Sequence, residues 1–192
     1  LLDYLPTIAD FPKPGIQFRD ISPLLGDPAA FAEAIRHMAA IAQQFDYSHI
    51  VGVESRGFVF ASALALHTQK SLVLVRKPNK LPLASHRESY GLEYGSDALE
   101  IQSTSLPVGS RALLIDDVLA TGGTAEAAAK LVQQAGADVV AVGPREVPGQ
   151  LKPRARRQRG VVLGIAVKRR ALLVVLFAIA VLSCKRTEPT RA

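Results

Sequence analysis

The chain of 192 residues has one cysteine, no tryptophan and few aromatic residues, which make up 6% of it. The single cysteine, Cys184, excludes an internal disulfide and a cysteine-based metal cluster. So few aromatic side chains argue against a stacking platform for single-stranded nucleic acid. Acidic and proline residues interrupt the first stretch, so we expect no signal peptide. A content of 48% apolar and 21% charged residues indicates a folded domain rather than a disordered chain.

The net charge of +6 is distributed unevenly along the chain. Residues 1–143 contain 11 Lys or Arg and 15 Asp or Glu, a net charge of −4, whereas residues 144–192 contain 12 and 2, a net charge of +10. Because all the excess basicity lies in the tail, we expect the body not to bind nucleic acid. We predict one domain over 1–143 and an atypical basic and apolar tail over 144–192. The abrupt change suggests a shifted reading frame or a different C-terminal exon.

The tail contains two apolar runs, 161–167 and 171–184, which three basic residues separate. The second run is shorter than the roughly 20 residues that cross a bilayer, so we expect no membrane partner. The first run is long enough to pair as one strand. Residues 144–160 contain three prolines and no periodic apolar face, so we expect the tail not to complete a sheet.

Short apolar runs alternate with helical patterns, which predicts an α/β fold with a mostly parallel central sheet flanked by helices. The predicted helices start at residue 28 and span 58–67 and 124–135, and the predicted strands span 49–53, 71–76, 98–101, 110–115 and 137–142. Residues 9–23 are rich in Pro, Asp and Gly and predict an extended loop. Residues 77–95 are basic and polar without a clear period, which is typical of a functional segment or one that is partly strand.

The most informative segment is LLIDDVLATGGT at 113–124. An apolar strand ends in Asp116 and Asp117, and a loop of small and hydroxyl residues then starts a helix. Helix N-termini favour phosphate, whereas two carboxylates suit ribose hydroxyls or a Mg²⁺ held between a sugar and a diphosphate. The segment therefore predicts a sugar-phosphate site. The alternative interpretation is a tight strand–helix turn with solvent-exposed acids.

Together with four other segments, this motif resembles the adenine phosphoribosyltransferase family of type I phosphoribosyltransferases. The other segments are FPKPGIQFRDISPLL at 11–25, GVESRGFVFASALA at 52–65, VRKPNKLP at 75–82 and YGLEYGSDALEIQ at 90–102. The resemblance covers about residues 8–142. It implies a type I fold with an N-terminal base-binding loop and a mobile lid, a strained or cis peptide bond at Glu54–Ser55, and a cytoplasmic homodimer.

The resemblance also implies a reaction. Adenine and 5-phosphoribosyl 1-pyrophosphate would give AMP and pyrophosphate in purine salvage, with Mg²⁺ carried by the diphosphate rather than held directly by the protein. Two alternatives stay open, a phosphoribosyltransferase acting on another base and a catalytically impaired, nucleotide-binding regulatory protein. A chain that does not function because of its altered tail is a third.

The implied substrate-binding residues form four groups. They are an adenine pocket at Gln17, Phe18 and Arg19, a pyrophosphate site at Ser55, Arg56, Gly57, Arg76, Lys77 and Lys80, a ribose site at Asp116 and Asp117, and a 5′-phosphate loop at Ala120, Thr121, Gly122, Gly123 and Thr124. An arginine can bind two phosphate oxygens at once, which agrees with the role implied for Arg56. Without the resemblance, Phe18 would be interpreted as a core residue and the basic cluster as a solvated surface.

Glu93 and Tyr94 lie in the segment that matches the family's catalytic lid. Adenine must lose a proton when its N9 attacks the anomeric carbon, so a carboxylate near the base could relay that proton. The resemblance therefore implies that Glu93 and Tyr94 are catalytic. A purely regulatory protein would not need them.

Overall fold

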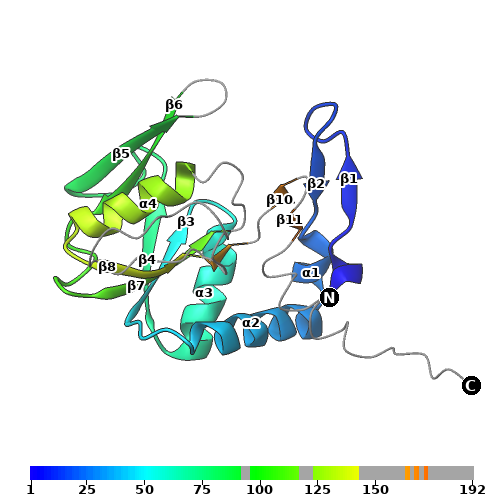
Figure 1. Ribbon diagram of the computed structural model, residues 1–192, viewed down its shortest axis with the longest axis horizontal. Helices are drawn as coiled ribbons and strands as arrows, with labels where there is room; N and C mark the ends of the chain where they lie inside the picture. The colour runs from blue at the N-terminus through cyan, green and yellow to red at the C-terminus, as the bar shows by residue number, and fades with distance from the viewer. Residues whose placement is uncertain (92–95, 117–122, 143–162, 165–166, 169–170, 173–192) are drawn as a thin grey trace, which may run out of the picture.

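The computed structural model describes residues 1–91, 96–116, 123–142, 163–164, 167–168 and 171–172. Its centre is a seven-stranded sheet whose strands follow the order β5-β6-β4-β3-β7-β8, with β9 paired to β7. Helices cover the two faces of this sheet, and an N-terminal hairpin lies apart from it (Figure 1). The segments that carry the family resemblance lie in both the sheet and the hairpin.

The middle of the sheet is parallel, as predicted. It consists of β4 (Ser71–Arg76), β3 (His49–Val53), β7 (Arg111–Asp116) and β8 (Asp138–Val142). The antiparallel strands β6 (Ser96–Gln102) and β5 (Ser85–Gly91) extend it at one edge. The bounds of β3 and β4 match the two predicted strands, because each is a short apolar run buried in the sheet. β5 confirms that the stretch 77–95 is partly strand.

Alternate residues of the central strands pack on opposite faces. Ile50, Leu113 and Ile115 contact one core cluster, with α2 (Pro28–Ala42) and α3 (Gly57–Thr68). Val51 and Leu114 contact the other cluster, with α4 (Gly123–Gln134). The three predicted helices are therefore confirmed, one face carrying two of them and the opposite face the third.

Two helix boundaries follow from the sequence. Asp27 precedes α2 and its Oδ1 accepts a hydrogen bond from the Ala30 amide at 2.8 Å, while Pro28 occupies the first helical position. Gly136 follows α4 with a φ of +82°, the left-handed conformation that glycine adopts readily. These terminal residues start α2 and end α4 where the chain must turn back to the sheet.

The prediction of an extended loop over 9–23 is wrong in part. A short 3₁₀ helix η1 (Leu2–Tyr4) is followed by β1 (Thr7–Ala9), which pairs antiparallel with β2 (Gln17–Arg19), and α1 (Ser22–Gly26) follows. Each strand has only three residues and much of the hairpin is exposed, so it leaves no strong apolar period in the sequence.

The tail contributes three short strands to the described structure. β9 (Leu163–Gly164) pairs in parallel with the end of β7, opposite Ile115 and Asp116. β10 (Val167–Lys168) and β11 (Ala171–Leu172) pair with each other. The apolar run 161–167 thus supplies one strand of two residues to the sheet. Among the helices that the structure describes, none is both long and apolar enough to span a bilayer.

Candidate active site

The carboxyl ends of β3, β4 and β7 lie at the same edge of the sheet. Val53 is paired with Val75, and Gly52 with Ile115. Arg76, Glu54 and Asp116 therefore follow one another across the edge in that order, each one residue beyond these pairs. Ligands of open parallel sheets bind at this edge. The strand register thus brings together residues of three segments that the sequence analysis singled out, 52–65, 75–82 and 113–124.

The turn from β3 into α3 lies directly against the end of β7. A Cβ atom placed on Gly57 would be 2.9 Å from the Ile115 carbonyl oxygen and 3.5 Å from Asp116 Oδ1. Only glycine therefore fits without moving the backbone. The peptide bond between Glu54 and Ser55 is cis, which confirms the conformation that the resemblance implies.

The acidic strand end is buried, since Asp116 is 6% exposed. Gly123 and Thr124, at the start of α4, are half-buried. The other residues predicted for the ribose and 5′-phosphate sites, Asp117, Ala120, Thr121 and Gly122, lie outside the described residues, as do Glu93 and Tyr94. Their predicted roles stay predictions.

The N-terminal hairpin reaches the same turn. The Arg56 guanidinium lies over the Phe18 ring, with Cζ 5.1 Å from the ring centroid. The Phe11 ring meets Phe18 edge to face at 5.0 Å. Phe18 is half-buried and belongs to neither core cluster, so its interpretation as a core residue is not supported. Phe18 of the predicted adenine pocket and Arg56 of the predicted pyrophosphate site thus lie side by side.

The neighbours of Phe18 have different environments. Gln17 is exposed, and Arg19 Nη1 donates to the Leu5 carbonyl oxygen at 2.8 Å, which ties the hairpin to the N-terminal segment. Asp20 Oδ1 accepts from the amide and hydroxyl of Ser22. These hydrogen bonds, with a contribution from the Arg56 charge, hold the pKa of Asp20 below its ordinary value. Asp20 thereby orders the start of α1 beside the predicted base site.

The basic cluster of Arg76, Lys77 and Lys80 is ion-paired rather than simply solvated. Arg76 Nε and Lys80 Nζ both donate to the Glu54 carboxylate, at 3.3 and 3.1 Å. Lys77 Nζ donates to Asp97 Oδ2 and, at 2.9 Å, to the Tyr90 hydroxyl. Two carboxylates thus partly offset three cations, so the cluster keeps a net positive charge suited to a polyanion.

The pKa values reflect these contacts. Burial would raise the pKa of Glu54, but hydrogen bonds from the Lys77 amide and from Lys80, with the charges of Arg76 and Lys80, hold it below its ordinary value. For Lys77, desolvation is outweighed by Asp97 and Tyr90, and the pKa is raised. The hydrogen bond from Lys77 correspondingly lowers the pKa of Asp97. Glu54, Lys77 and Asp97 are therefore charged near neutral pH.

The sequence predicts Glu54 only as part of the segment 54–57 that matches the family's pyrophosphate loop, and it does not single out Tyr90 or Asp97. All three stand inside segments that carry the family resemblance, so those segments could have indicated them. Their contacts with Arg76, Lys77 and Lys80 join residues 13 to 26 positions apart, and only the tertiary structure shows such pairings. Among the described residues there is no group of three metal-ligating side chains.

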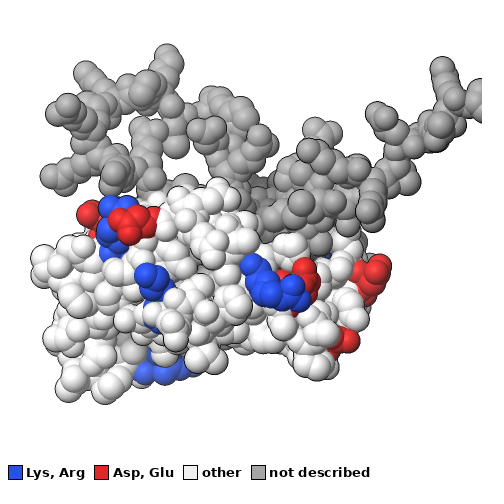
Figure 2. Space-filling model, turned by 90° about the horizontal axis from the view of Figure 1, so that it is seen from below, with Lys and Arg blue, Asp and Glu red and all other residues white. Residues whose placement is uncertain are grey.

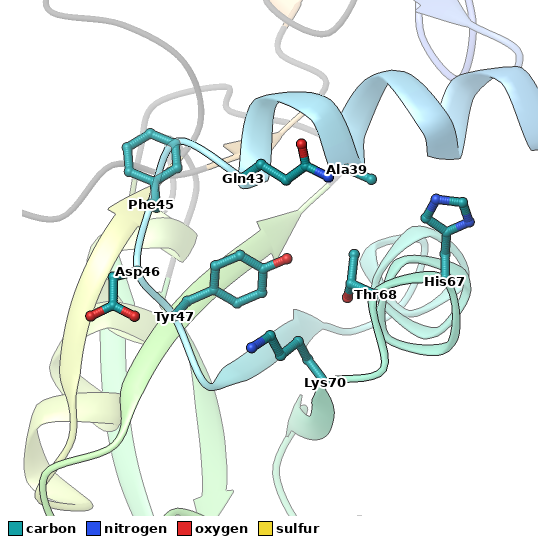
Figure 3. A pocket seen from close by; sticks show the side chains of 8 residues that line it. All are labelled: Ala39, Gln43, Phe45, Asp46, Tyr47, His67, Thr68 and Lys70. Carbon is teal, nitrogen blue, oxygen red and sulfur yellow. The ribbon is translucent and has the colours of Figure 1, made fainter.

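A hollow of about 430 Å³ lies at the opposite end of β3 and α3. Figure 3 shows that it is lined by side chains from the end of α2, the segment before β3 and the end of α3. Tyr47 packs there with Lys70 Nζ 5.5 Å from its ring centroid. None of the predicted site residues lines this hollow, so it is separate from the candidate active site.

The surface around α2 differs from the site edge. Figure 2, which shows the molecule from below the view of Figure 1, presents small groups of charged side chains, in some of which Lys or Arg lies beside Asp or Glu, on a largely uncharged surface. At the site edge, by contrast, Arg56, Arg76, Lys77 and Lys80 come from two neighbouring strand ends. The concentration of cations marks that edge as the place for an anionic ligand.

Comparisons with known proteins agree with this geometry. A sequence model of the family described as "Phosphoribosyl transferase domain" matches residues 24–143. The adenine phosphoribosyltransferase of Polynucleobacter asymbioticus is 67% identical over 139 residues, which are 72% of this chain and 81% of that protein.

Two solved structures are similar to this chain. The crystal structure of adenine phosphoribosyltransferase from Thermoanaerobacter pseudethanolicus is 42% identical with a TM-score of 0.71, covering 73% of this chain and 81% of that one. The enzyme from Saccharomyces cerevisiae, complexed with an imino-altritol bisphosphate and adenine, is 39% identical with a TM-score of 0.71 and a coverage of 73% and 82%.

Proposed function

The chain belongs to the phosphoribosyl transferase family, and from this premise we propose that it is an adenine phosphoribosyltransferase acting in purine salvage. It has the type I phosphoribosyltransferase fold, with a mostly parallel sheet flanked by helices. The reaction transfers the phosphoribosyl group of 5-phosphoribosyl 1-pyrophosphate to N9 of adenine and gives AMP and pyrophosphate. The enzyme is thus a pentosyltransferase.

The observation that carries this function is the arrangement of four residues around the turn after β3. Phe18 contacts Arg56, and Gly57, the next residue, packs against Asp116. An aromatic surface, a cation and a carboxylate therefore lie close together around one turn. A purine base, a diphosphate and a ribose that meet at one anomeric carbon require such a grouping.

Each part of the substrates has a corresponding group of residues in this proposal. Adenine stacks on Phe18, with the backbone at Gln17 and Arg19 available to its edge. The diphosphate binds to Ser55, Arg56 and Gly57, and to the basic cluster of Arg76, Lys77 and Lys80. The ribose hydroxyls bind to Asp116 and Asp117. The 5′-phosphate binds to the loop from Ala120, Thr121 and Gly122 into Gly123 and Thr124, where the first amides of α4 can donate.

The catalytic step requires proton transfer and exclusion of water. As N9 attacks the anomeric carbon and the diphosphate leaves, the proton of N9 passes to a base, for which we propose Glu93. Tyr94 is the neighbour that would accompany it at the reacting centre. Exclusion of water protects the electron-poor ribosyl carbon from hydrolysis.

Mg²⁺ fits the donor chemistry of the site. When bound, it would neutralise charge on the diphosphate and stabilise its departure. Asp116 presents a carboxylate beside Gly57, and carboxylates and phosphates are the oxygen ligands that Mg²⁺ prefers. We propose that the ion enters with the diphosphate, which carries it, while the acids at the end of β7 bind the ribose hydroxyls.

The assembly that we propose is a homodimer. Val59 and Leu66 lie on α3, a helix that is apolar on most sides, and they are 38% and 84% exposed. A helix apolar all round is normally buried, so a second copy of this chain would cover that surface. The domain boundary near residue 143 is supported by the end of the family match. A cytoplasmic location stays an expectation from the family resemblance.

An assay with a panel of bases tests the function. The purified chain, given 5-phosphoribosyl 1-pyrophosphate and Mg²⁺, should convert adenine to AMP and release pyrophosphate, with little turnover of hypoxanthine or guanine. Preferential turnover of another base would favour the first alternative. Tight binding of AMP without any turnover would favour a regulatory protein. Sequencing the coding DNA across codons 140–150 tests whether the tail comes from a shifted frame.

A further inference from the structure

We propose that Glu54 is a positioning residue that holds Arg76 and Lys80 in place for the diphosphate, an inference that rests on the proposed function. It differs from the roles assigned above because a carboxylate would repel the diphosphate. Glu54 therefore acts through the two cations rather than on the substrate.

The contacts of Glu54 join the ends of two neighbouring strands. Oε2 accepts from the Lys77 amide at 2.8 Å and from Arg76 Nε at 3.3 Å, and Oε1 accepts from Lys80 Nζ at 3.1 Å. The Glu54 amide also donates to the Val75 carbonyl oxygen at 2.9 Å. One residue at the end of β3 thus fixes both the backbone and the side chains of the segment that follows β4.

This arrangement keeps the binding surface of Arg76 available. Glu54 uses the Nε atom, while Nη1 donates to the Lys80 carbonyl oxygen at 3.0 Å and closes the segment 76–80 on itself. The Glu54 side chain is only 10% exposed, whereas Arg76 and Lys80 are 31% and 52% exposed. The carboxylate therefore lies beneath the cations, and the cations face the solvent from which the diphosphate arrives.

A different role for Glu54 would be a temporary counter-ion that the diphosphate displaces. The two roles predict opposite effects for Glu54→Gln. If Glu54 only competes with the diphosphate for the cations, removal of its negative charge strengthens diphosphate binding. Loss of the anchor weakens binding if Glu54 positions the cations. The hydrogen bond to the Lys77 amide favours positioning, because a displaced carboxylate would leave that backbone donor without its acceptor.

The test is titration calorimetry of the full chain with inorganic pyrophosphate and Mg²⁺. We expect Glu54→Gln to raise the dissociation constant about tenfold, as for a lost charge-assisted hydrogen bond. KM for 5-phosphoribosyl 1-pyrophosphate should rise while KM for adenine stays unchanged. Glu54→Asp, which keeps the charge on a shorter side chain, should lose less affinity. An unchanged or smaller dissociation constant for Glu54→Gln would overturn the proposal.

Two further variants separate positioning from general destabilisation. Glu88→Gln removes a carboxylate that pairs with Lys130 at 3.3 Å, away from the basic cluster, and should leave pyrophosphate affinity unchanged. In an Arg76→Gln background, Glu54→Gln should have a clearly smaller effect, because Glu54 acts partly through Arg76. Additive effects of the two substitutions would contradict the proposal.

The outcomes distinguish this inference from the function on which it rests. If the wild-type chain binds no pyrophosphate, the proposed function fails and the role of Glu54 with it. If the wild-type chain binds pyrophosphate and Glu54→Gln binds it equally well, only the role of Glu54 fails. Should Glu54→Gln not fold, Glu54→Asp decides in its place, since loss of affinity at unchanged melting temperature supports positioning and unchanged affinity opposes it.

Discussion

Gly57 packs so closely against Asp116 that a Cβ atom on Gly57 would lie 3.3 Å from the Asp116 Cα and 3.5 Å from its Oδ1. This contact joins the turn after β3 to the acidic end of β7. In the proposed function it brings the diphosphate site and the ribose site within one substrate's length. This proximity, and not the backbone conformation, requires the glycine, because the φ of Gly57 lies outside the left-handed region.

Gly57→Ala should therefore separate the turn from Asp116. The added methyl would meet the Ile115 carbonyl oxygen at 2.9 Å, and the resulting overpacking should cost about 1–3 kcal/mol of unfolding free energy. We expect a lower kcat/KM together with a lower urea midpoint. Gly26→Ala is the matched control, since a Cβ there meets nothing within 4 Å. Equal behaviour of the two variants would contradict the packing argument.

Phe18→Leu should weaken the use of adenine selectively. Stacking on an aromatic ring contributes about 1–3 kcal/mol per base, so KM for adenine should rise by roughly 5- to 150-fold. KM for 5-phosphoribosyl 1-pyrophosphate should change little. Phe11→Leu provides a graded control, because that ring contacts Phe18 in an edge-to-face pair and is not itself proposed to stack on the base. A larger effect from Phe11→Leu would show that Phe18 is not the stacking surface.

The ion pair of Lys77 and Asp97 should contribute a pH-dependent stability. The pKa of Asp97 is lowered, so its contribution is present above the unfolded-state value of 3.8 and is lost as the pH falls through the folded-state value. The pKa of Lys77 is raised, so its contribution persists to above 10.5. Both groups are about one-third exposed, and solvent screening limits the pair to about 0.5–1 kcal/mol.

Urea unfolding of Asp97→Asn against the wild type measures this contribution. The difference in unfolding free energy should be constant between about pH 5 and pH 8 and should shrink as the pH falls below 3.8. A difference that grows on acidification has the wrong sign for a stabilising ion pair. That result would remove Asp97 as the counter-ion of Lys77.

Leu66→Glu should disrupt the proposed homodimer. Leu66 is 84% exposed on α3, and a charge at that position cannot be buried without a compensating group. Light scattering after size-exclusion chromatography should give twice the chain mass for the wild type and the chain mass for the variant. Val108→Glu replaces another exposed apolar residue away from α3 and should stay dimeric. A monomeric wild type would exclude this interface.

Local signals in the sequence predict the sheet and the helices well. β3 and β4 are short apolar runs, and α2 starts at the proline of an Asp-Pro pair, so their bounds follow from burial and capping. β2 is not predicted, because three residues in an exposed hairpin carry no periodic signal. The proximity of Phe18, Arg56 and Asp116 depends on how β2 packs near the turn after β3.

Some site residues can be predicted from local composition, and others cannot. Arg76 and Lys80 stand out as cations in a mildly acidic body, so a phosphate role can be predicted for them. Glu54 lies more than 20 positions earlier and becomes relevant only through parallel pairing of β3 with β4. Long-range ion pairs of this kind follow from register rather than from local composition.

The most direct test of the account is a crystal structure of the full chain with Mg²⁺, adenine and a non-reactive analogue of 5-phosphoribosyl 1-pyrophosphate. The account predicts adenine stacked on Phe18, the diphosphate against Arg56 and Arg76, and the ribose hydroxyls at Asp116. Adenine or the diphosphate bound elsewhere, such as in the hollow beside Tyr47, with the edge of β3, β4 and β7 free of ligand, would contradict it.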